Sequence, residues 1–580
     1  MDENALGMTL GMLAIALTWV AALAAFCGLG LSLLRWMGFE RDGSEGLFAA
    51  VWIGWALGLG VLQVWHLFRP VDVWARAALL TFGAAGLIWN LRPVLAGLRR
   101  AIRGVLPFAA AALLLTLWLA NRAMAPEMHP DAGLYHLSTV EWLSAYPIVP
   151  GLGNLNWRLA FNSSYFVYMA AMDFGPWSHH AQHVAVYLML LALSLQVGWS
   201  GVCVLLGTRV MRCQDLFRLV LIPAIVRKMW AGIHEGEPDL AMWVLGIVIV
   251  DQLIQVLENP SREGSDRTSV LAVLMVSGAA IAVRLSAGML AIAACLVVLI
   301  WCARKAKTAV GTRGRSIRSI MPVLLSSLLI AVWVLRGYVL SGYPAFPSTL
   351  GGVRVDWRVP GSIASSEARW IMSWARLPGV EPDVVLRDWA WLSPWLKKVT
   401  ALGSFDLVAP MAIAFVGLLV ALARRRRWEA RELGLMGVAA VPLASLGFWF
   451  ATAPEPRFAG AAAWLLAACS VLLAAERWGQ ARRHGFGRAV LLVVVVAALA
   501  PHLTAPKRIP PGPDEGFYPL PHVDVVEVTL PSGLTYLRPV RENQCWDAPL
   551  PCAPYPPDDL ELRSPGDLSR GFRVMLGEAE

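Results

Sequence analysis

Four short polar stretches of this chain place carboxylates near cations. The first, "HPDAGLYHLSTVEWL", carries Asp131, Tyr135 and His136, and Arg158 follows in the turn-rich stretch "PIVPGLGNLNWRLAFNSS". A carboxylate can take a proton from a hydroxyl group, and an arginine can hold a phosphate through its forked N–H donors. Together these residue types suit the transfer of a group from a phosphate to a hydroxyl.

The other three stretches repeat this mixture. "GIHEGEPDLAMW" carries Glu237 and Asp239 directly before an apolar run, "IAVRLSAGML" carries Arg284 among apolar residues, and "TAPEPRFAG" carries Arg457. A cation in an apolar segment must reach a polar interface or bind an anion there. We therefore expect Asp131 to act as a catalytic base, and a bound phosphate donor to contact residues of all four stretches: Tyr135, His136, Arg158, Glu237, Asp239, Arg284 and Arg457.

Simpler interpretations of the same residues stay open. Asp131 and Asp239 each stand where a helix is expected to begin, so either carboxylate can serve only as a helix N-cap, and His136 can simply face water. The Trp-rich stretches "WIMSWARLP" and "RDWAWLSPWLKK" suit an interfacial aromatic belt as well as a sugar-stacking surface. The histidines of "WSHHAQH" have no nearby carboxylate to complete a zinc site, so no metal and no certain cofactor is predicted.

The composition indicates a membrane protein. Of the 580 residues, 57% are hydrophobic and 15% are charged, a balance far more apolar than that of soluble domains. The formal net charge of +9 comes from short clusters between apolar runs, such as "LRPVLAGLRRAIRG" and "ARRRRWEARELG". Such clusters are typical of cytoplasmic loops, so the charge does not indicate a nucleic-acid partner.

Apolar runs divide the chain into spans and loops. At about 20 residues per span, we predict about fourteen transmembrane helices, and Pro223 with its flanking cations predicts that the span near 216–230 is broken or half inserted. The fold class is therefore an all-α polytopic membrane protein with large extracytoplasmic loops that carry short amphipathic helices. Its predicted segments are a four-helix segment (1–121), a loop with an amphipathic helix (122–181), central helices (182–337), a Trp-rich loop (338–404), C-terminal helices (405–503) and a polar tail (504–580).

The distribution of Lys and Arg predicts the orientation of these segments. Loops rich in Lys and Arg alternate along the chain with loops that contain few of these residues. Because basic loops stay on the cytoplasmic side, this alternation places the four polar stretches and the tail together on the extracytoplasmic side. Cys545 and Cys552 stand in the tail as "NQCWDAPLPCAPY". A cysteine pair that closes a short Pro-rich loop predicts a disulfide, and disulfides form in oxidising compartments. The cysteines therefore agree with an outside tail.

Three features resemble the GT-C superfamily of membrane glycosyltransferases, which includes protein O-mannosyltransferases and the aminoarabinose transferase of lipid A. They are the acidic motif "PDAGLYH" in a large outer loop, the second acidic motif "EGEPDLAMW" before a helix, and the many spans. The resemblance implies an inverting glycosyltransferase of the bacterial inner membrane, with a polyprenyl-phosphate sugar as donor substrate, Asp131 as base, and a glycolipid, polysaccharide or protein as acceptor. Its expected partners are membrane lipid and the lipid-linked donor.

The chain also resembles bacterial membrane proteins of unassigned function in "SGYPAFP", "RFAG" and "CWDAPLPC". Two other functions stay open. A transporter or flippase of lipid-linked sugars needs ionisable residues and helix breaks at mid-bilayer depth, for which Asp251 and Arg284 are the candidates. A noncatalytic scaffold for envelope assembly would use the polar loops for docking and would tolerate alanine at Asp131.

Overall fold

The fold is given by a computed structural model, which describes residues 3–39, 43–100, 102–125, 129–173, 181–231, 238–258, 263–308, 317–504 and 520–575. Within these ranges, nine helices are long and apolar enough to cross a membrane, and three shorter ones are also apolar. The chain is therefore a mostly helical membrane protein, as the composition predicts. The finer prediction of about fourteen spans rests on length alone and stays a prediction.

The first helices of the chain pack so closely that, where they cross, there is no room for a side chain between their backbones. A methyl group on Gly28 would lie 1.9 Å from the backbone oxygen of Gly83, so this crossing requires glycine. Small residues allow such close contact between membrane helices. The helices of this segment are α1 (Glu3–Met37), α2 (Gly43–His66), α3 (Val73–Trp89), α4 (Leu91–Arg100) and α5 (Ile102–Ala123).

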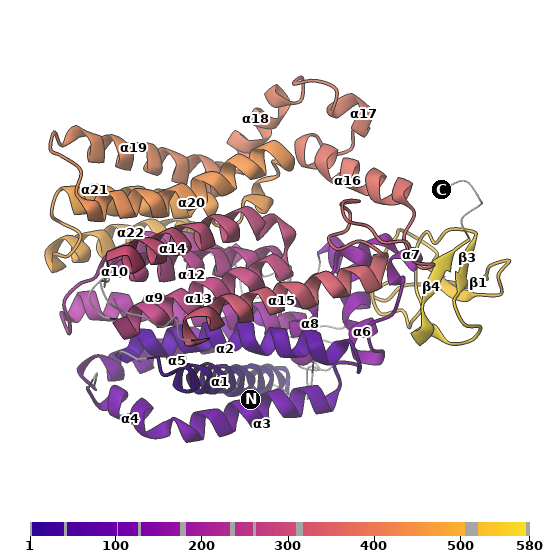
Figure 1. Ribbon diagram of the computed structural model, residues 1–580, viewed down its shortest axis with the longest axis horizontal. Helices are drawn as coiled ribbons and strands as arrows, with labels where there is room; N and C mark the ends of the chain where they lie inside the picture. Colours follow the sequence, from indigo (N-terminus) through magenta and orange to yellow (C-terminus); the bar gives the residue numbers. More distant parts are fainter. Residues whose placement is uncertain are drawn as a thin grey trace.

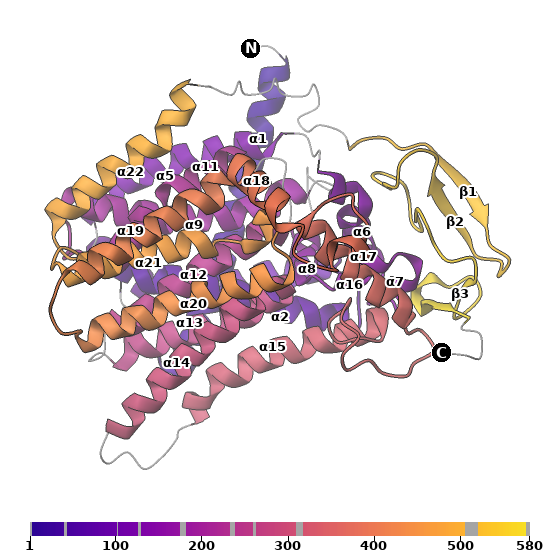
Figure 2. The ribbon, with the colours of Figure 1, turned by 90° about the horizontal axis from the view of Figure 1, so that it is seen from above.

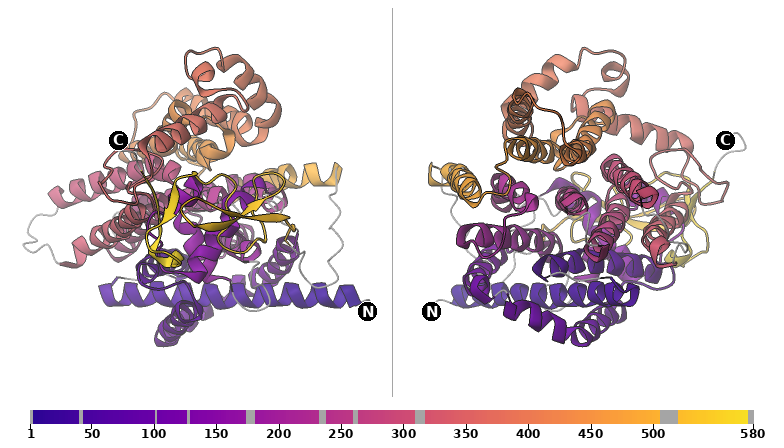
Figure 3. Two further views of the ribbon diagram at one scale, coloured as in Figure 1. Left: turned by 90° about the vertical axis from the view of Figure 1, so that its right-hand side faces the viewer. Right: turned by 60° about the vertical axis from the view of Figure 1, so that its left-hand side comes forward.

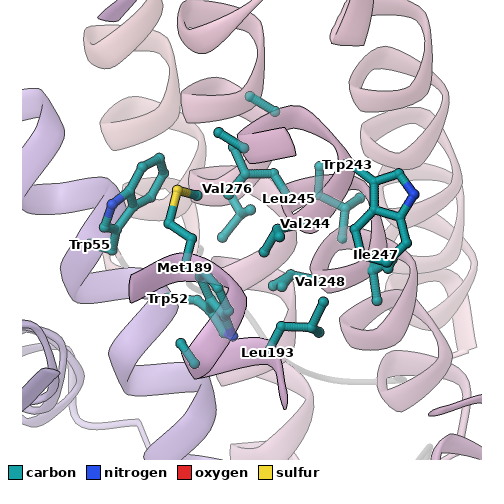
Figure 4. Packing of buried hydrophobic residues seen from close by; sticks show 14 of the residues in the cluster. Trp52, Trp55, Met189, Leu193, Trp243, Val244, Leu245, Ile247, Val248 and Val276 are labelled. Atoms are coloured by element: carbon teal, nitrogen blue, oxygen red, sulfur yellow. The ribbon is translucent and has the colours of Figure 1, made fainter. Parts of the chain in front are cut away.

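The core lies where α2 meets three central helices (Figure 4). Of the most apolar window of α12, 94% is buried inside the protein, so α12 is surrounded by protein rather than by lipid. The central helices are α9 (Gln182–Leu206), α12 (Pro238–Glu258), α13 (Glu263–Val283), α14 (Gly288–Thr308) and α15 (Ile317–Ser341). The C-terminal helices are α19 (Ala409–Ala423), α20 (Ala430–Thr452), α21 (Ala462–Arg477) and α22 (His484–Thr504).

The predicted break near Pro223 is present, because two short helices, α10 (Cys213–Val220) and α11 (Ile222–Ala231), replace one long one. Proline disfavours helical geometry in the residue before it and removes a backbone donor, which explains why the helix is interrupted here. The break divides the weakest of the expected spans into two pieces.

Arg218 of α10 ties three helices together through buried ion pairs. Its Nη2 lies 2.7 Å from a Glu45 carboxylate oxygen in α2, and its Nε lies 2.7 Å from one of Asp251 in α12. Its Nη1 also donates to the hydroxyl of Ser200. Replacing Arg218 with an uncharged residue would remove the cation that is paired with the buried Asp251 carboxylate, which is strongly destabilising. The Asp251 site named above as a transport candidate is thus filled by a paired arginine.

The connecting segments gather at one end of the bundle, where α6, α7, α16 and the strands of the tail lie side by side (Figures 1 and 2). The basic α4 lies toward the other end (Figure 1). The helices at this end of the bundle, which the charge distribution predicts to be the outer region, are η1 (Ala132–His136), α6 (Leu137–Ala145), α7 (Leu152–Leu155), η2 (Trp157–Phe161), α8 (Ser164–Ala171), α16 (Gly361–Arg376), α17 (Pro382–Val385) and α18 (Leu392–Leu402). Short η turns also join membrane helices: η5 (Leu285–Ala287), η6 (Ser404–Val408) and η7 (Pro456–Ala459).

The tail folds as two small antiparallel hairpins that lie across this end of the bundle (Figure 3). Strand β1 (Val525–Thr529) pairs with β2 (Thr535–Pro539), and β3 (Leu560–Leu562) pairs with β4 (Phe572–Val574). The turn η8 (Leu568–Arg570) precedes β4. The backbone N–H of Phe572 donates to Pro150, and its ring meets that of Trp142 edge-on. The tail is therefore packed onto the loop that carries Asp131.

Candidate functional site

Asp131 does not cap a helix. Its own backbone is helical (φ −67°, ψ −22°), and its side chain makes no capping hydrogen bond to η1, the π-helical turn that follows. Its carboxylate instead lies 4.0 Å from Nη1 of Arg158 and 3.7 Å from Nη2 of Arg457. The cap interpretation of Asp131 is therefore wrong, and the carboxylate faces two arginines from distant parts of the chain.

Asp239 joins the same group. One of its oxygens lies 2.6 Å from Nη1 of Arg284, and the other lies 4.0 Å from Nε of Arg457. Arg457 thus stands between the two aspartates. We call these five residues the outer charge cluster: Asp131, Arg158, Asp239, Arg284 and Arg457.

Breaks between helices place the members of the outer charge cluster. Arg284 stands in extended conformation between α13 and η5, and Arg457 lies in η7, which Pro456 opens between α20 and α21. Arg158 lies in η2, whose first turn is fixed by the side chain of Asn156, which accepts the Arg158 N–H. A residue at the end of a helix can reach across to its neighbours, so chain breaks bring these side chains together.

The cluster is accessible and carries excess positive charge. Three arginines and two aspartates give it a formal charge of +1. The side chains of Asp131 and Arg457 are 24% and 32% exposed, whereas that of Asp239 is 7% exposed. The tight, buried Asp239–Arg284 pair is suited to hold an arginine in position. Asp131 is the more accessible carboxylate, and it sits beside arginines that can receive an anion.

Two aromatic rings form a wall of the cluster. The guanidinium carbon of Arg457 lies 5.1 Å from the ring centroids of both Trp374 and Phe458, and that of Arg284 lies 4.8 Å from Phe458. Lys398 adds a further cation 5.8 Å from Trp374. A guanidinium over an aromatic face is held in a defined plane. Trp374 belongs to the Trp-rich loop, so that loop reaches the site.

A third carboxyl group, Glu367 of α16, lies near Arg158. Burial raises the pKa of the Glu367 carboxyl, and the positive charge of Arg158 acts in the opposite direction. This group accepts a proton more readily than an exposed glutamate. The sequence does not predict that Glu367 lies near Arg158, because Glu367 belongs to no recognisable motif and is far from Arg158 along the chain.

Tyr135 and His136, both expected to bind the donor, are placed mainly in an aromatic cluster beneath η1. His136 is 3% exposed, and its ring lies 4.9 Å from that of Phe166 and 4.4 Å from that of Tyr135. The backbone N–H of Asp131 donates to Nδ1 of His129 at 3.1 Å. The motif "HPD" carries this signal, because an Asp two residues after a His allows such a local bond.

Glu237 lies outside the described residues, as do the neighbouring His234 and Glu235. In the described ranges, no group of three or more His, Cys, Asp or Glu side chains is arranged to hold a metal ion. The functional chemistry that can be argued from the structure therefore rests on the outer charge cluster and its aromatic wall.

The disulfide loop of the tail packs directly on η1. Cys545 and Cys552 are joined by a disulfide, and the N–H of Cys545 donates to the carbonyl of Gly133 at 2.8 Å. The ring of Trp546 lies so close that a methyl group on Gly133 would be 2.5 Å from it. The amide of Gln544 donates to the carbonyl of Pro130. The tail thus holds the backbone on both sides of Asp131.

Beside this contact, Glu141 of α6 shares a small region with other acids. Burial, followed by the negative charges of Asp173 and Asp547, raises the pKa of the Glu141 carboxyl to about 7. Asp547 belongs to the tail, so the protonation of Glu141 is linked to how the tail sits on α6.

Residues 12–464 match the model of a protein family described as a domain of unknown function (DUF8201). The matched region includes the whole outer charge cluster and ends before the hairpins of the tail. No curated protein and no solved structure matches the chain. Because the family model covers more than half of the sequence, the chain belongs to the DUF8201 family.

Proposed function

We propose that this protein is a membrane glycosyltransferase that moves a sugar from a polyprenyl-phosphate-linked donor to an envelope acceptor at the outer face of the membrane. The observation that carries the proposal is the outer charge cluster. Four chain segments far apart in sequence bring two carboxylates and three arginines within ion-pair distance at one end of the bundle. A charge cluster with one accessible base and excess positive charge suits a reaction in which a phosphate leaves.

In the proposed reaction, Asp131 takes the proton of an acceptor hydroxyl while that oxygen forms a bond to the anomeric carbon of the sugar. The bond between this carbon and the donor phosphate oxygen breaks, and the lipid phosphate leaves with the electron pair. Arg158 and Arg457 offset the charge that grows on the phosphate. Atoms and charge balance without a further reactant.

The distances within the cluster support this division of roles. Charged N–H···O hydrogen bonds are about 2.7–2.9 Å long, and in the Asp239–Arg284 ion pair the nearest nitrogen and oxygen atoms are 2.6 Å apart. The two arginines beside Asp131 are 3.7 and 4.0 Å away. Asp131 is thus separated from both arginines by more than the length of a direct charged hydrogen bond. The Trp374 ring offers a face against which a sugar can stack.

The two other functional classes find less support. The buried acid that a transporter could use, Asp251, is paired with Arg218 at 2.7 Å and accepts from Gln196 at 2.9 Å. Its hydrogen-bonding capacity is used to hold helices together. A scaffold gives no reason for a partly exposed aspartate to be kept between two arginines.

The test is the substitution Asp131→Asn, which keeps the size of the side chain and removes the base. A general base contributes about 10²–10⁴-fold to rate, so we expect sugar transfer to fall by that factor while the protein folds and still binds lipid-linked sugar. The readout is mass spectrometry of envelope glycolipids in a deletion strain that carries each variant.

Asp383→Asn is the matched control, because Asp383 is an exposed outer aspartate that pairs with Arg369 away from the cluster. It should restore the wild-type glycolipid profile. If Asp131→Asn restored that profile equally well, Asp131 would not be the base and the enzymatic proposal would fail.

A further inference from the structure

A small cavity lies next to the outer charge cluster, between α15, the end of α2, α6 and η2. Its volume is about 30 Å³, and most of its wall is apolar. Its charged or titratable lining residues are His66, Arg158 and Arg336, and no aspartate or glutamate lines it. The cavity is therefore lined by two positively charged side chains and by no negatively charged one.

Arg336 is the more deeply buried of the two arginines. It is 2% exposed, and its Nη1 lies 2.7 Å from Nδ1 of His66. Because a guanidinium has only donors, this ring nitrogen must be the acceptor, so His66 is neutral in this contact and brings no negative charge. The Nε of Arg336 has no hydrogen-bond partner in the part of the chain that the structure describes.

Two other buried arginines, Arg218 and Arg376, have a different environment from that of Arg336. Arg218 is enclosed by Asp251 and Glu45. Arg376 donates to three backbone carbonyls, those of Met372, Ala451 and Thr452. Each therefore meets either negative charge or several oxygen acceptors, whereas Arg336 meets one imidazole nitrogen.

Burying such a charge is costly. An unpaired buried charge costs several kcal/mol, to order of magnitude, and most residues avoid this by losing the charge. Arginine cannot do so, because its guanidinium stays protonated in proteins. The positive charge of Arg336 must be balanced by something that can occupy the adjoining cavity.

We propose that this cavity is a binding site for a small inorganic anion of halide size, held by Arg336 with Arg158 at its side. About 30 Å³ of the cavity is open to the centre of a water-sized sphere, so a monatomic ion such as chloride fits in it. A tetrahedral phosphate with its four oxygens is larger. The mostly apolar wall suits a weakly hydrated monovalent ion.

The site adjoins the candidate active site through Arg158, whose Nη1 is 4.0 Å from Asp131. The two sites share Arg158, but Arg336 has no ion pair with any member of the outer charge cluster among the described residues. The existence of the anion site is testable without any assay of transfer.

The experiment measures thermal unfolding of the full-length protein, purified in detergent, as sodium gluconate is replaced by sodium chloride at constant ionic strength. A ligand that binds only the folded state raises its stability as concentration exceeds Kd. We expect the unfolding midpoint of the wild type to rise with chloride. An unchanged midpoint would show that the cavity holds water only and would overturn the proposal.

Two variants identify the site. Arg336→Gln removes the buried charge, so it should lose the chloride response and be at least as stable as the wild type in gluconate. Arg376→Gln removes an arginine that is already satisfied by carbonyls, so it should be less stable but keep the response. A chloride response retained in Arg336→Gln would refute the assignment to this cavity.

Measurements with bromide and with phosphate distinguish a halide site from a phosphate site. Bromide should replace chloride in the stability assay and give an anomalous scattering peak beside Arg336 in a crystal. Sodium phosphate at the same ionic strength should stabilise less than chloride. If phosphate stabilised more, and did so only when Arg336 was present, the site would be a phosphate site and the halide assignment would be wrong.

Discussion

Arg457 is the residue through which the two aspartates of the outer charge cluster are connected. It lies 3.7 Å from Asp131 and 4.0 Å from Asp239, and its guanidinium is stacked near Trp374 and Phe458. A group held in this way is oriented before a ligand arrives. Such preorganisation reduces the cost of binding.

Replacing Arg457 with Gln should therefore weaken donor binding more than it slows the chemical step. The phosphate is present before and during the reaction, and a hydrogen bond to a charged group contributes about 1.5–3 kcal/mol. We expect KM for the lipid-linked donor to rise about 10–100-fold, which follows from that energy, with a smaller change in kcat. Arg369→Gln, in an exposed outer pair, is the control. A fall in kcat with unchanged KM would instead place Arg457 in the transition state alone.

The contact between η1 and the tail depends on the absence of a side chain at Gly133. Gly133→Ala would push a methyl group to 2.5 Å from the Trp546 ring, and overpacking of this kind costs about 1–3 kcal/mol. We expect a lower unfolding midpoint and faster proteolysis of the tail. Gly437→Ala is the control, since a methyl group there meets nothing within 4 Å. Equal midpoints for the two variants would show that the tail does not depend on this contact.

Among the elements, η1 and α6 are held from two sides. Helix α8 supports them from below through the contact of Phe166 with His136, and the tail covers them through Cys545 and Trp546. A π-helical turn such as η1 is a local irregularity that is often found at functional sites. Here it sets the direction in which the preceding Asp131 points.

Glu141 makes the stability of this contact depend on pH. Because its folded pKa is about 7 and its ordinary value is 4.5, the folded protein binds the proton more tightly than the unfolded chain does. The stabilisation that protonated Glu141 contributes is therefore complete below about pH 4.5. This contribution is lost as the pH rises toward and through 7. Glu141→Gln removes that loss.

The expected result is that Glu141→Gln unfolds at a higher temperature than the wild type at pH 8, and at nearly the same temperature at pH 5. Thermal unfolding in detergent at the two pH values measures it. Glu527→Gln, on an outer strand of the tail, should follow the wild type at both. A difference between Glu141→Gln and wild type that did not change with pH would exclude titration of Glu141 as its cause.

In the whole molecule, the two ends of the helix bundle carry different kinds of segments. The Asp131 loop, the Trp-rich loop and the tail share one end, and the basic α4 lies toward the other (Figures 1 and 2). Positive loops are retained on the cytoplasmic side of a membrane. The end that carries the outer charge cluster is therefore expected to face outward.

Cysteine labelling in intact cells tests this orientation. A cysteine at Leu350, which is 81% exposed in the outer region, should react with a maleimide that cannot cross membranes. A cysteine at Arg427, in the basic connection between α19 and α20, should react only after the membrane is permeabilised. Wild-type protein, with its six free cysteines, gives the background. The reverse pattern would invert the orientation and move the cluster to the inner face.

Local properties of the sequence determined much of this protein. Hydropathy alone identifies a helical membrane protein, because a span needs only a run of apolar residues. Pro223 predicts the interruption between α10 and α11, since proline acts on its own neighbours. The spacing of Cys545 and Cys552 in a Pro-rich loop predicts their disulfide. Each of these features depends on residues that are close together along the chain.

Only the tertiary structure decided which polar residues meet. Asp131 lies directly before η1, Asp239 lies in the first turn of α12 and Arg457 lies in η7, and the distances between them follow from how the surrounding helices pack. The same packing placed the ring of His136 against those of Tyr135 and Phe166. It also left Arg336 beside a cavity without an acid. Helix packing is set by the fit of many side chains at once, so no short stretch of sequence contains it.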